Sequence, residues 1–147
     1  MPSTSTPELA LAPELSVSQW LNSAQPITLA GLRGRVVLIH AFQMLCPGCV
    51  MHGIPQTRRI AQLLQRDDFV VLGLHSVFVH EFRLEFPIGI DRHEPGSSLP
   101  MTMRAYGLQG TPTTLLIDRA GTLRMHEFGA VDDLALGVRI GELLAQA

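Results

Sequence analysis

The chain has 147 residues, a formal net charge of −2, 46% hydrophobic residues and 16% charged residues. This length and composition predict one globular domain and exclude a disordered chain. The small net charge and the lack of a block of basic residues argue against nucleic acid as a partner.

The N-terminal residues 1–15 are rich in Pro, Ser and Thr, so we expect a loose segment there and one domain over residues 16–147. The sequence starts without the basic and apolar regions of a secretory signal. It also has no apolar run of the roughly 18 residues that a membrane span requires. These features predict a cytoplasmic protein with no membrane partner.

The first part of the domain is expected to contain a short helix over residues 16–21, with Ser16 as its N-cap. A short extended piece is predicted at 27–29, and a turn at 31–34. Residues 35–42 form a continuous apolar run with many β-branched residues. Such a run is typical of a central strand that is buried on both faces.

A long helix is predicted over residues 50–64, with a kink or a broken first turn at Pro55, where Gly53 also loosens the chain. Three further elements follow: a second buried strand at 69–75, a short extended piece at 86–91 and a short helix at 99–106.

The C-terminal part predicts a strand at 113–118, a hairpin turn at 119–121 and a returning strand at 122–128. A closing helix is expected over 131–145, with four candidate core residues: Leu134, Val138, Leu143 and Leu144. The order β-α-β, connecting helix, hairpin and helix predicts an α/β fold in which helices flank a mixed β-sheet.

The only two cysteines, Cys46 and Cys49, follow the predicted strand 35–42 and open the predicted helix. A helix N-terminus carries about half a positive charge and free N–H groups, which stabilise a thiolate. In such motifs the thiol pKa falls from about 8.5 to roughly 3.5–7. We therefore predict that Cys46, in the first turn, is the nucleophile and that the more buried Cys49 resolves the mixed disulfide.

Two other interpretations of this pair stay open at this point. The cysteines could be purely structural, or they could bind a metal ion. A metal site needs about four ligands, usually Cys or His, and only His52 lies close in the sequence. We therefore predict no metal site.

A second motif, Gly-Thr-Pro-Thr-Thr-Leu-Leu-Ile-Asp at residues 110–118, leads into the third strand. Together with the Cys-Pro-Gly-Cys motif at 46–49 after a buried strand, it resembles the thioredoxin superfamily, in particular the TlpA-like and redoxin branch of thiol–disulfide oxidoreductases. The resemblance extends from about Ile27 to the C-terminus. It implies a thioredoxin-like fold.

The resemblance also implies that Pro112 is a cis proline beside the cysteine pair. An X–Pro bond takes the cis form at little cost. Because proline has no N–H, the backbone of its neighbour Thr111 is left free to pair with an extended substrate. Pro47 suits the first position of a helix, and Gly48 leaves room for a substrate. From the residues alone, a trans proline opening a strand would be expected at 112.

Several positions depart from the family pattern. His40 stands where thioredoxins have a buried acidic residue, and His52 stands where related proteins have an acid three residues past the second cysteine. Both histidines are candidates for proton transfer, although the residues alone favour a hydrogen-bonded core histidine at His40. Leu45 replaces the tryptophan that usually precedes the first cysteine.

The proline of the helix also departs from the pattern, because Pro55 follows Cys49 by six residues instead of five. The extra residue predicts a bulge around Gly53.

The residues and the resemblance together predict a thiol–disulfide oxidoreductase that needs no cofactor. Its partners would be a protein or small-molecule disulfide and a thiol electron donor that the sequence does not name. A peroxiredoxin-like peroxidase is the alternative enzyme, but Gln43 stands where that family has a threonine. A redox-sensing or metal-binding module with the same fold would share these features.

Overall fold

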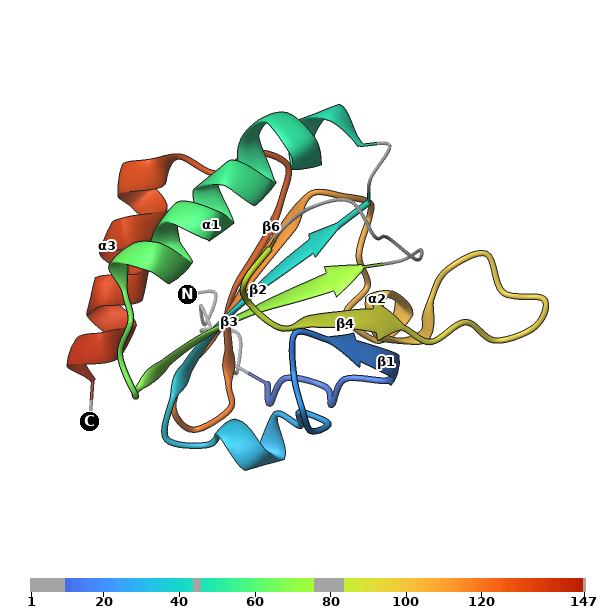
Figure 1. Ribbon diagram of the computed structural model, residues 1–147, viewed down its shortest axis with the longest axis horizontal. Helices are drawn as coiled ribbons and strands as arrows, with labels where there is room; N and C mark the ends of the chain where they lie inside the picture. Colours follow the sequence, from blue (N-terminus) through green and yellow to red (C-terminus); the bar gives the residue numbers. More distant parts are fainter. Residues whose placement is uncertain (1–9, 44–45, 76–83, 147) are drawn as a thin grey trace, which may run out of the picture.

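The computed structural model describes residues 10–43, 46–75 and 84–146, and their strands form one six-stranded mixed sheet in the order β1-β4-β3-β2-β5-β6 (Figure 1). The strands are β1 (Val17–Leu21), β2 (Val36–Phe42), β3 (Phe69–His75), β4 (Ile88–Asp91), β5 (Thr113–Ile117) and β6 (Leu123–Phe128). The helices and helical turns are η1 (Ala30–Leu32), η2 (Cys49–Gly53), α1 (Ile54–Leu63), α2 (Met101–Ala105) and α3 (Asp133–Ala145). The predicted fold class is confirmed.

The central strand β2 pairs in parallel with β3 and antiparallel with β5. All seven of its residues are buried, as the continuous apolar run predicts. Strand β4 continues the parallel set beyond β3, and β6 forms the antiparallel hairpin with β5. Gly121 lies in the turn of this hairpin with φ +84°, a conformation that favours glycine.

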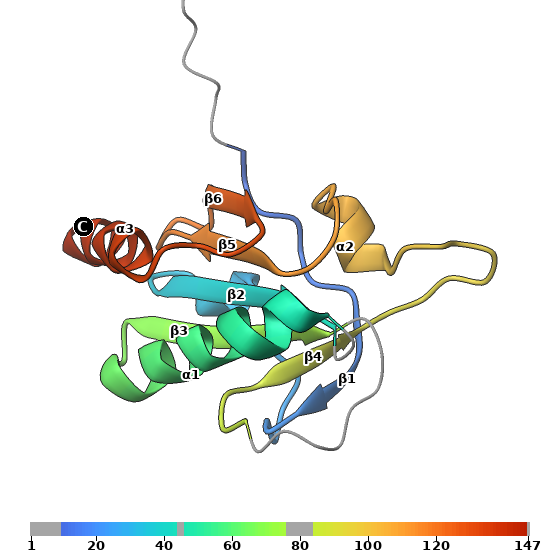
Figure 2. The same cartoon turned by 90° about the horizontal axis from the view of Figure 1, so that it is seen from above.

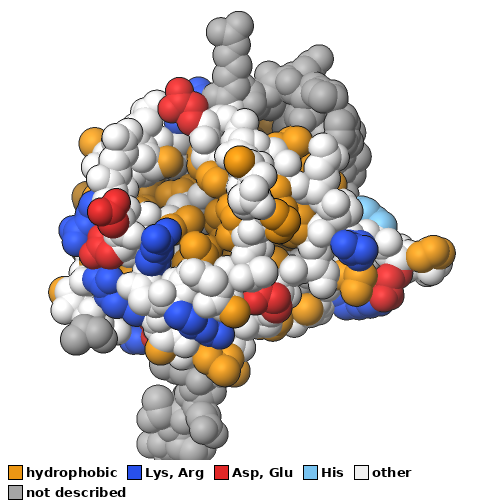
Figure 3. All heavy atoms as spheres, turned by 60° about the horizontal axis from the view of Figure 1, so that its bottom comes forward, with side chains coloured by type: hydrophobic (Ala, Val, Ile, Leu, Met, Phe, Trp, Pro, Cys, Tyr) orange, Lys and Arg blue, Asp and Glu red, His pale blue; other side chains and the backbone are white. Residues whose placement is uncertain are grey.

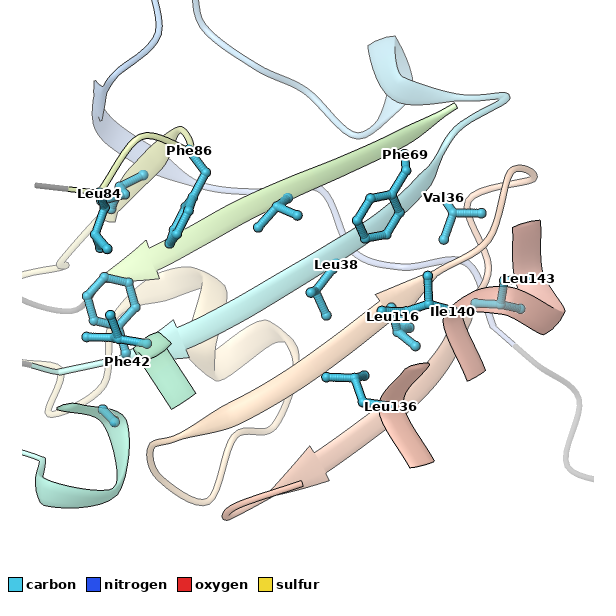
Figure 4. Close-up of a cluster of buried hydrophobic side chains, with 14 residues drawn as sticks. Val36, Leu38, Phe42, Phe69, Leu84, Phe86, Leu116, Leu136, Ile140 and Leu143 are labelled. Atoms are coloured by element: carbon cyan, nitrogen blue, oxygen red, sulfur yellow. The ribbon is translucent and has the colours of Figure 1, made fainter. Parts of the chain in front are cut away.

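Two buried clusters lie on opposite faces of the sheet. Helices α1 and α3 cover one face (Figures 1 and 2), where one cluster contains Leu38, Phe42, Leu116 and Ile140 (Figure 4) together with Ile54. The segment before β2 and helix α2 cover the other face, which contributes alternate residues of the same strands. His40 lies between Leu38 and Phe42 in β2, so the alternation places it on the face under α1 and α3.

Strand β1 corrects the prediction of a helix over residues 16–21. The segment pairs antiparallel with β4, and the Trp20 ring packs where a side chain on Gly89 would otherwise lie. Ser16 caps no helix there: its N–H donates to the Thr102 hydroxyl, and its carbonyl accepts from the Arg92 N–H. The edge of the sheet offers this segment backbone partners that the sequence does not reveal.

The segment before β2 differs from the prediction in two further places. Residues 27–29 form no strand, because the carboxylate of Glu14 accepts from the N–H groups of Leu29 and Ala30, where the turn η1 starts. Residues 10–15, expected to be loose, lie against the domain: Leu11 bridges to Thr122, and the Tyr106 hydroxyl donates to the Pro13 carbonyl. The predicted boundary at residue 16 is otherwise untested, and residues 1–9 lie outside the described residues.

The helix after the cysteines starts with the predicted irregularity. Cys49–Gly53 is a π-helical turn, and the regular helix α1 begins at Ile54 with Pro55 in its first turn. A π-helical turn contains one residue more than the α-helical path. The bulge predicted from the six-residue spacing between Cys49 and Pro55 is therefore confirmed.

In helix α3 the buried residues are Leu136, Ile140 and Leu143. Leu143 was predicted and Leu144 is partly buried, but Leu134 and Val138 are 80% and 60% exposed, so their assignment to the core is wrong. The helix has apolar residues on two sides, and only packing against the sheet decides which side is covered.

The surface outside the cysteine pair has its own hollows. A cavity of about 480 Å³ between α1 and strand β3 is lined by residues that include Arg58, Leu64, Val71 and Phe86, with neither cysteine among them. Figure 3 shows a face on which hydrophobic side chains gather in a hollowed middle and charged side chains lie around it. In the part of the chain that the structure describes, no helix is both long and apolar enough to cross a membrane.

Candidate active site

The site forms where the carboxyl end of β2 leads into the helix. Pro47 and Gly48 already have helical geometry there, one turn ahead of α1. A Cβ on Gly48 would lie 3.4 Å from the Pro112 ring, so the motif packs against the loop that precedes β5. The Thr111–Pro112 peptide bond is cis. The Cys46 Sγ lies 3.3 Å from the Thr111 carbonyl oxygen, to which the thiol donates.

The structure thus brings six of the eight predicted site residues together: Cys46, Pro47, Gly48, Cys49, Thr111 and Pro112. His40 and His52 lie in the next layer, and among the described residues neither histidine forms a hydrogen bond with a cysteine. Leu45 lies outside the described residues.

Cys46 is the partly exposed thiol of the pair. The N–H of Cys49 donates to its Sγ at 3.3 Å. Burial opposes ionisation of Cys46, but hydrogen bonds from the Cys49 thiol, the Thr111 side chain and the N–H groups of Cys49 and Gly48 lower its pKa below the usual 9.0. None of these causes is a charged side chain. The helix start therefore favours a thiolate at Cys46 through backbone and neutral groups.

Cys49 is fully buried and has the opposite tendency. Burial and the hydrogen bond to Cys46 raise the pKa of its thiol to about 11. It packs in the same cluster as Leu38, Phe42 and Ile54. At neutral pH it is a protonated thiol beside a more acidic one.

His40 is buried, and burial, with a smaller contribution from the charge of His52, lowers its pKa to about 4. The imidazole is therefore neutral at pH 7. Its ring stacks on Phe42, with the centroids 5.5 Å apart, and rests against the backbone of Gly53. Within the described residues its Nε2 has no hydrogen-bond partner.

His52 faces helix α3 and not the sulfur atoms. Its Nε2 lies 2.9 Å from the Val131 carbonyl oxygen, which also accepts from the Gln56 amide at 2.7 Å. Gln56 donates in addition to Asp133, at the start of α3. These contacts, which the sequence analysis missed, connect the cysteine-bearing turn and the start of α1 to the start of α3.

The described segments that contain or adjoin the site residues carry apolar side chains and no charged ones. Met51, one turn beyond Pro47, is 81% exposed. Phe128, which the sequence analysis also missed, is 53% exposed and packs on Gly110 beside the Thr111 loop. Residues 46–53, 109–113 and 128–131 contain no Asp, Glu, Lys or Arg. Among the described residues, no cluster of three or more His, Cys, Asp or Glu side chains could hold a metal ion.

Comparison with known proteins agrees with this geometry. No family model matches the chain. A thioredoxin-like superfamily protein of known crystal structure, SPOA0173, is 50% identical, has a TM-score of 0.88, and is aligned over 93% of this chain and 97% of its own. The chain belongs to the thioredoxin-like superfamily. A thiol-disulfide isomerase from Corynebacterium glutamicum is 39% identical with a TM-score of 0.81, over 92% of this chain and 98% of its own.

These two relatives confirm the thioredoxin-like fold that the resemblance in the sequence predicts. The curated relatives found are the DipZ proteins of Mycobacterium bovis and Mycobacterium tuberculosis, which are 28% identical over 152 residues. That alignment covers 92% of this chain but 21% of DipZ, so the chain spans about a fifth of these relatives.

Proposed function

We propose that this thioredoxin-like oxidoreductase works through the Cys46-Pro47-Gly48-Cys49 motif, with Cys46 as the nucleophile and Cys49 as the resolving cysteine. The supporting observation is the contrast between the two thiols. Cys46 is accessible with a lowered pKa, and Cys49 is buried with a pKa raised to about 11. The thiolate is the attacking species, so the first attack belongs to Cys46.

The reaction then proceeds in two exchanges. The Cys46 thiolate attacks one sulfur of a substrate disulfide, forms a mixed disulfide and releases the first substrate thiolate. Cys49 loses its proton and attacks Cys46 Sγ, which forms the Cys46–Cys49 disulfide and releases the second substrate thiolate. The two electrons that reduce the substrate come from the two cysteines, so no cofactor is required. A thiol donor must return them.

The loop of Thr111 and Pro112 is the proposed platform for the substrate. It contacts Cys46 and lies against Gly48, and both Pro47 and Gly48 are exposed. Pro112 has no N–H and Thr111 lies outside the strands, so an extended chain with a disulfide fits along this loop. Protein disulfides are the substrate class that we propose, with reduction as the direction in a cytoplasmic setting.

Proton transfer during the second exchange is a separate part of the proposal. Cys49 must give up a proton at a pKa of about 11, and His40 and His52 are the predicted candidates to receive or relay it. His40 is neutral at pH 7, which an acceptor requires, but its pKa of about 4 makes it a weak base. The relay by either histidine stays a prediction.

A redox titration tests the proposed function. The protein is equilibrated in dithiothreitol or glutathione buffers, quenched with acid and alkylated, and its free cysteines are counted by mass spectrometry. A reversible two-electron transition between about −270 and −120 mV, the span of related proteins, is the expected result. If Cys46 and Cys49 never pair, or pair only irreversibly, the proposal fails.

A further inference from the structure

The turn that carries Cys49 is wider than the helix that it opens. In Cys49–Gly53 the Ile54 N–H donates to the Cys49 carbonyl, five residues back. Such π-helical turns occur frequently at functional sites. Here the extra residue lies between the buried Cys49 and Pro55. The width of the turn therefore decides the position of Cys49 relative to strand β2.

The ring of His40 fills the space between this turn and β2. A Cβ built on Gly53 would lie 2.7 Å from His40 Nε2, closer than real Cβ contacts, so the ring rests directly on the glycine backbone. On its other side the ring stacks on Phe42, with an angle of 7° between the planes. Phe42 shares a buried cluster with Cys49. His40 therefore contacts Gly53 at the end of the turn directly. Its stacking partner, Phe42, packs in the same cluster as Cys49, at the start of the turn.

Hydrogen bonds also hold the turn. The buried Thr57 hydroxyl donates to the Gly53 carbonyl at 2.7 Å, within the same helix. The His52 ring bonds to the Val131 carbonyl at the approach to α3. The turn is thus held between the approach to α3 and the sheet, and the imidazole ring of His40 lies between its end and β2.

Stability does not explain a histidine at this place. Its Nε2 is buried and has no partner among the described residues, which costs free energy that an apolar side chain would avoid. An unsatisfied buried polar group in a folded protein needs a reason of another kind. The shape of the ring against Gly53 provides one.

We propose that His40 is a positioning residue for the second exchange: its flat ring, between β2 and Gly53, fixes the π-helical turn and thereby the place of Cys49 behind Cys46. The inference rests on the proposed function, because it concerns the attack of Cys49 on the mixed disulfide. Without the ring the turn settles toward the sheet, and the Cys49 sulfur moves out of line. The first exchange depends on Cys46, which precedes the turn, and is affected far less.

Rapid-mixing kinetics with 5,5′-dithiobis(2-nitrobenzoate) separate the two exchanges. This coloured disulfide releases one thiol when Cys46 attacks and a second when Cys49 resolves the mixed disulfide. Four variants are compared with the wild type: His40→Ala, His40→Phe, Gly53→Ala, and the double variant His40→Ala with Gly53→Ala. His126→Ala, which changes an exposed histidine in β6, is the matched control, and circular dichroism verifies that each variant is folded.

The expected result is that His40→Ala slows the second release by on the order of 10- to 100-fold, as a misplacement of about 1 Å does, while the first release changes by less than about twofold. Gly53→Ala slows the second release as well, because its methyl group displaces the ring. His40→Phe keeps a flat ring and retains most of the rate. In the double variant the new methyl group occupies vacated space, so the rate partly returns.

Three outcomes overturn the inference. If His40→Ala leaves the second release unchanged, His40 does not position Cys49. If His40→Phe is as slow as His40→Ala, the nitrogen atoms are needed and the role is proton transfer. If both releases slow together, the effect is general loss of structure. A wild-type protein that releases only one thiol would instead refute the proposed function itself.

Discussion

The outer side of the active site, around Cys46, is open and has no charged residue in its described segments, whereas the inner side, around Cys49, is buried in the core. Two residues separate the two cysteines, and both contact the same helix start. Yet the pKa of Cys46 is lowered and that of Cys49 is raised to about 11. This contrast supports the proposed order of the two exchanges. Because both residues are cysteines, they differ only in their burial and in the hydrogen bonds that each sulfur makes.

The inner side also differs in how it is filled. His40 packs between Gly53 and Phe42, and Phe42 shares a buried cluster with Cys49, while Met51 and Phe128 are largely exposed. Changes on the inner side should therefore alter stability and the second exchange together. Changes on the outer side should alter only reactivity.

The largest expected effect is the difference between a substitution of Cys46 and the same substitution of Cys49. Cys46→Ser should abolish reaction with disulfides, because the accessible thiolate is lost. Cys49→Ser should react once and then stop as a mixed disulfide on Cys46. Intact-protein mass spectrometry after treatment with 5,5′-dithiobis(2-nitrobenzoate) detects the adduct. A stable adduct on Cys46→Ser, with none on Cys49→Ser, would reverse the assignment.

The next effect concerns stability in acid. The pKa of His40 is about 4 in the folded protein, against 6.5 when exposed, so the unfolded chain binds more protons between these values. The contribution of the neutral His40 ring to the free energy of unfolding is fully present above pH 6.5. It is lost as the pH falls toward 4. At about 1.4 kcal/mol per pKa unit, this amounts to roughly 3 kcal/mol.

Urea unfolding at several pH values between 7.5 and 4 measures this loss. His40→Phe should flatten the dependence, but part of it should remain, because burial also lowers the pKa of His75 to about 4. Two carboxyl groups have lowered pKa values: that of Asp68, which is hydrogen-bonded to Arg66, and that of Asp133, which is hydrogen-bonded to Gln56. Their contribution to the free energy of unfolding is lost only at lower pH. An unchanged pH dependence in His40→Phe would contradict a buried neutral imidazole.

A smaller effect is expected from two glycine substitutions that should change the free energy of unfolding in opposite directions. Gly53→Ala should destabilise the fold by about 1–3 kcal/mol, since the methyl group overlaps the His40 ring. Gly137→Ala in α3, where a Cβ meets nothing within 4 Å, should instead stabilise by about 0.5–1 kcal/mol. The free energy of unfolding in urea gives both values. Equal effects at the two sites would show that the inner side is not tightly packed.

The smallest effect is on the reactivity of Cys46. The hydrogen bond from the Cys49 thiol helps to lower the pKa of Cys46. Cys49→Ala removes that donor and should raise the pKa, while Cys49→Ser keeps a hydroxyl donor and should raise it less. The pH dependence of alkylation by iodoacetamide reports the pKa. If both variants titrate like the wild type, the backbone N–H groups alone stabilise the thiolate.

Much of the site was predictable because its signals are local. The apolar run at β2, the cysteine spacing and the Thr-Pro-Thr-Thr stretch each depend on neighbouring residues, and the spacing to Pro55 indicated the irregular turn. The contacts of Gln56 with Val131 and Asp133, and the position of Phe128 against Gly110, join residues far apart in the chain. No local pattern encodes such contacts.

The sequence by itself determined the α/β fold, the central strand, the cysteine pair at a helix start and the extra residue before Pro55, because periodicity, composition and spacing are properties of the chain. Only the tertiary structure decided that residues 17–21 form an edge strand, which side of α3 is covered, and that the His40 ring rests on Gly53. These outcomes depend on competition between distant segments for the same backbone partners and the same buried volume.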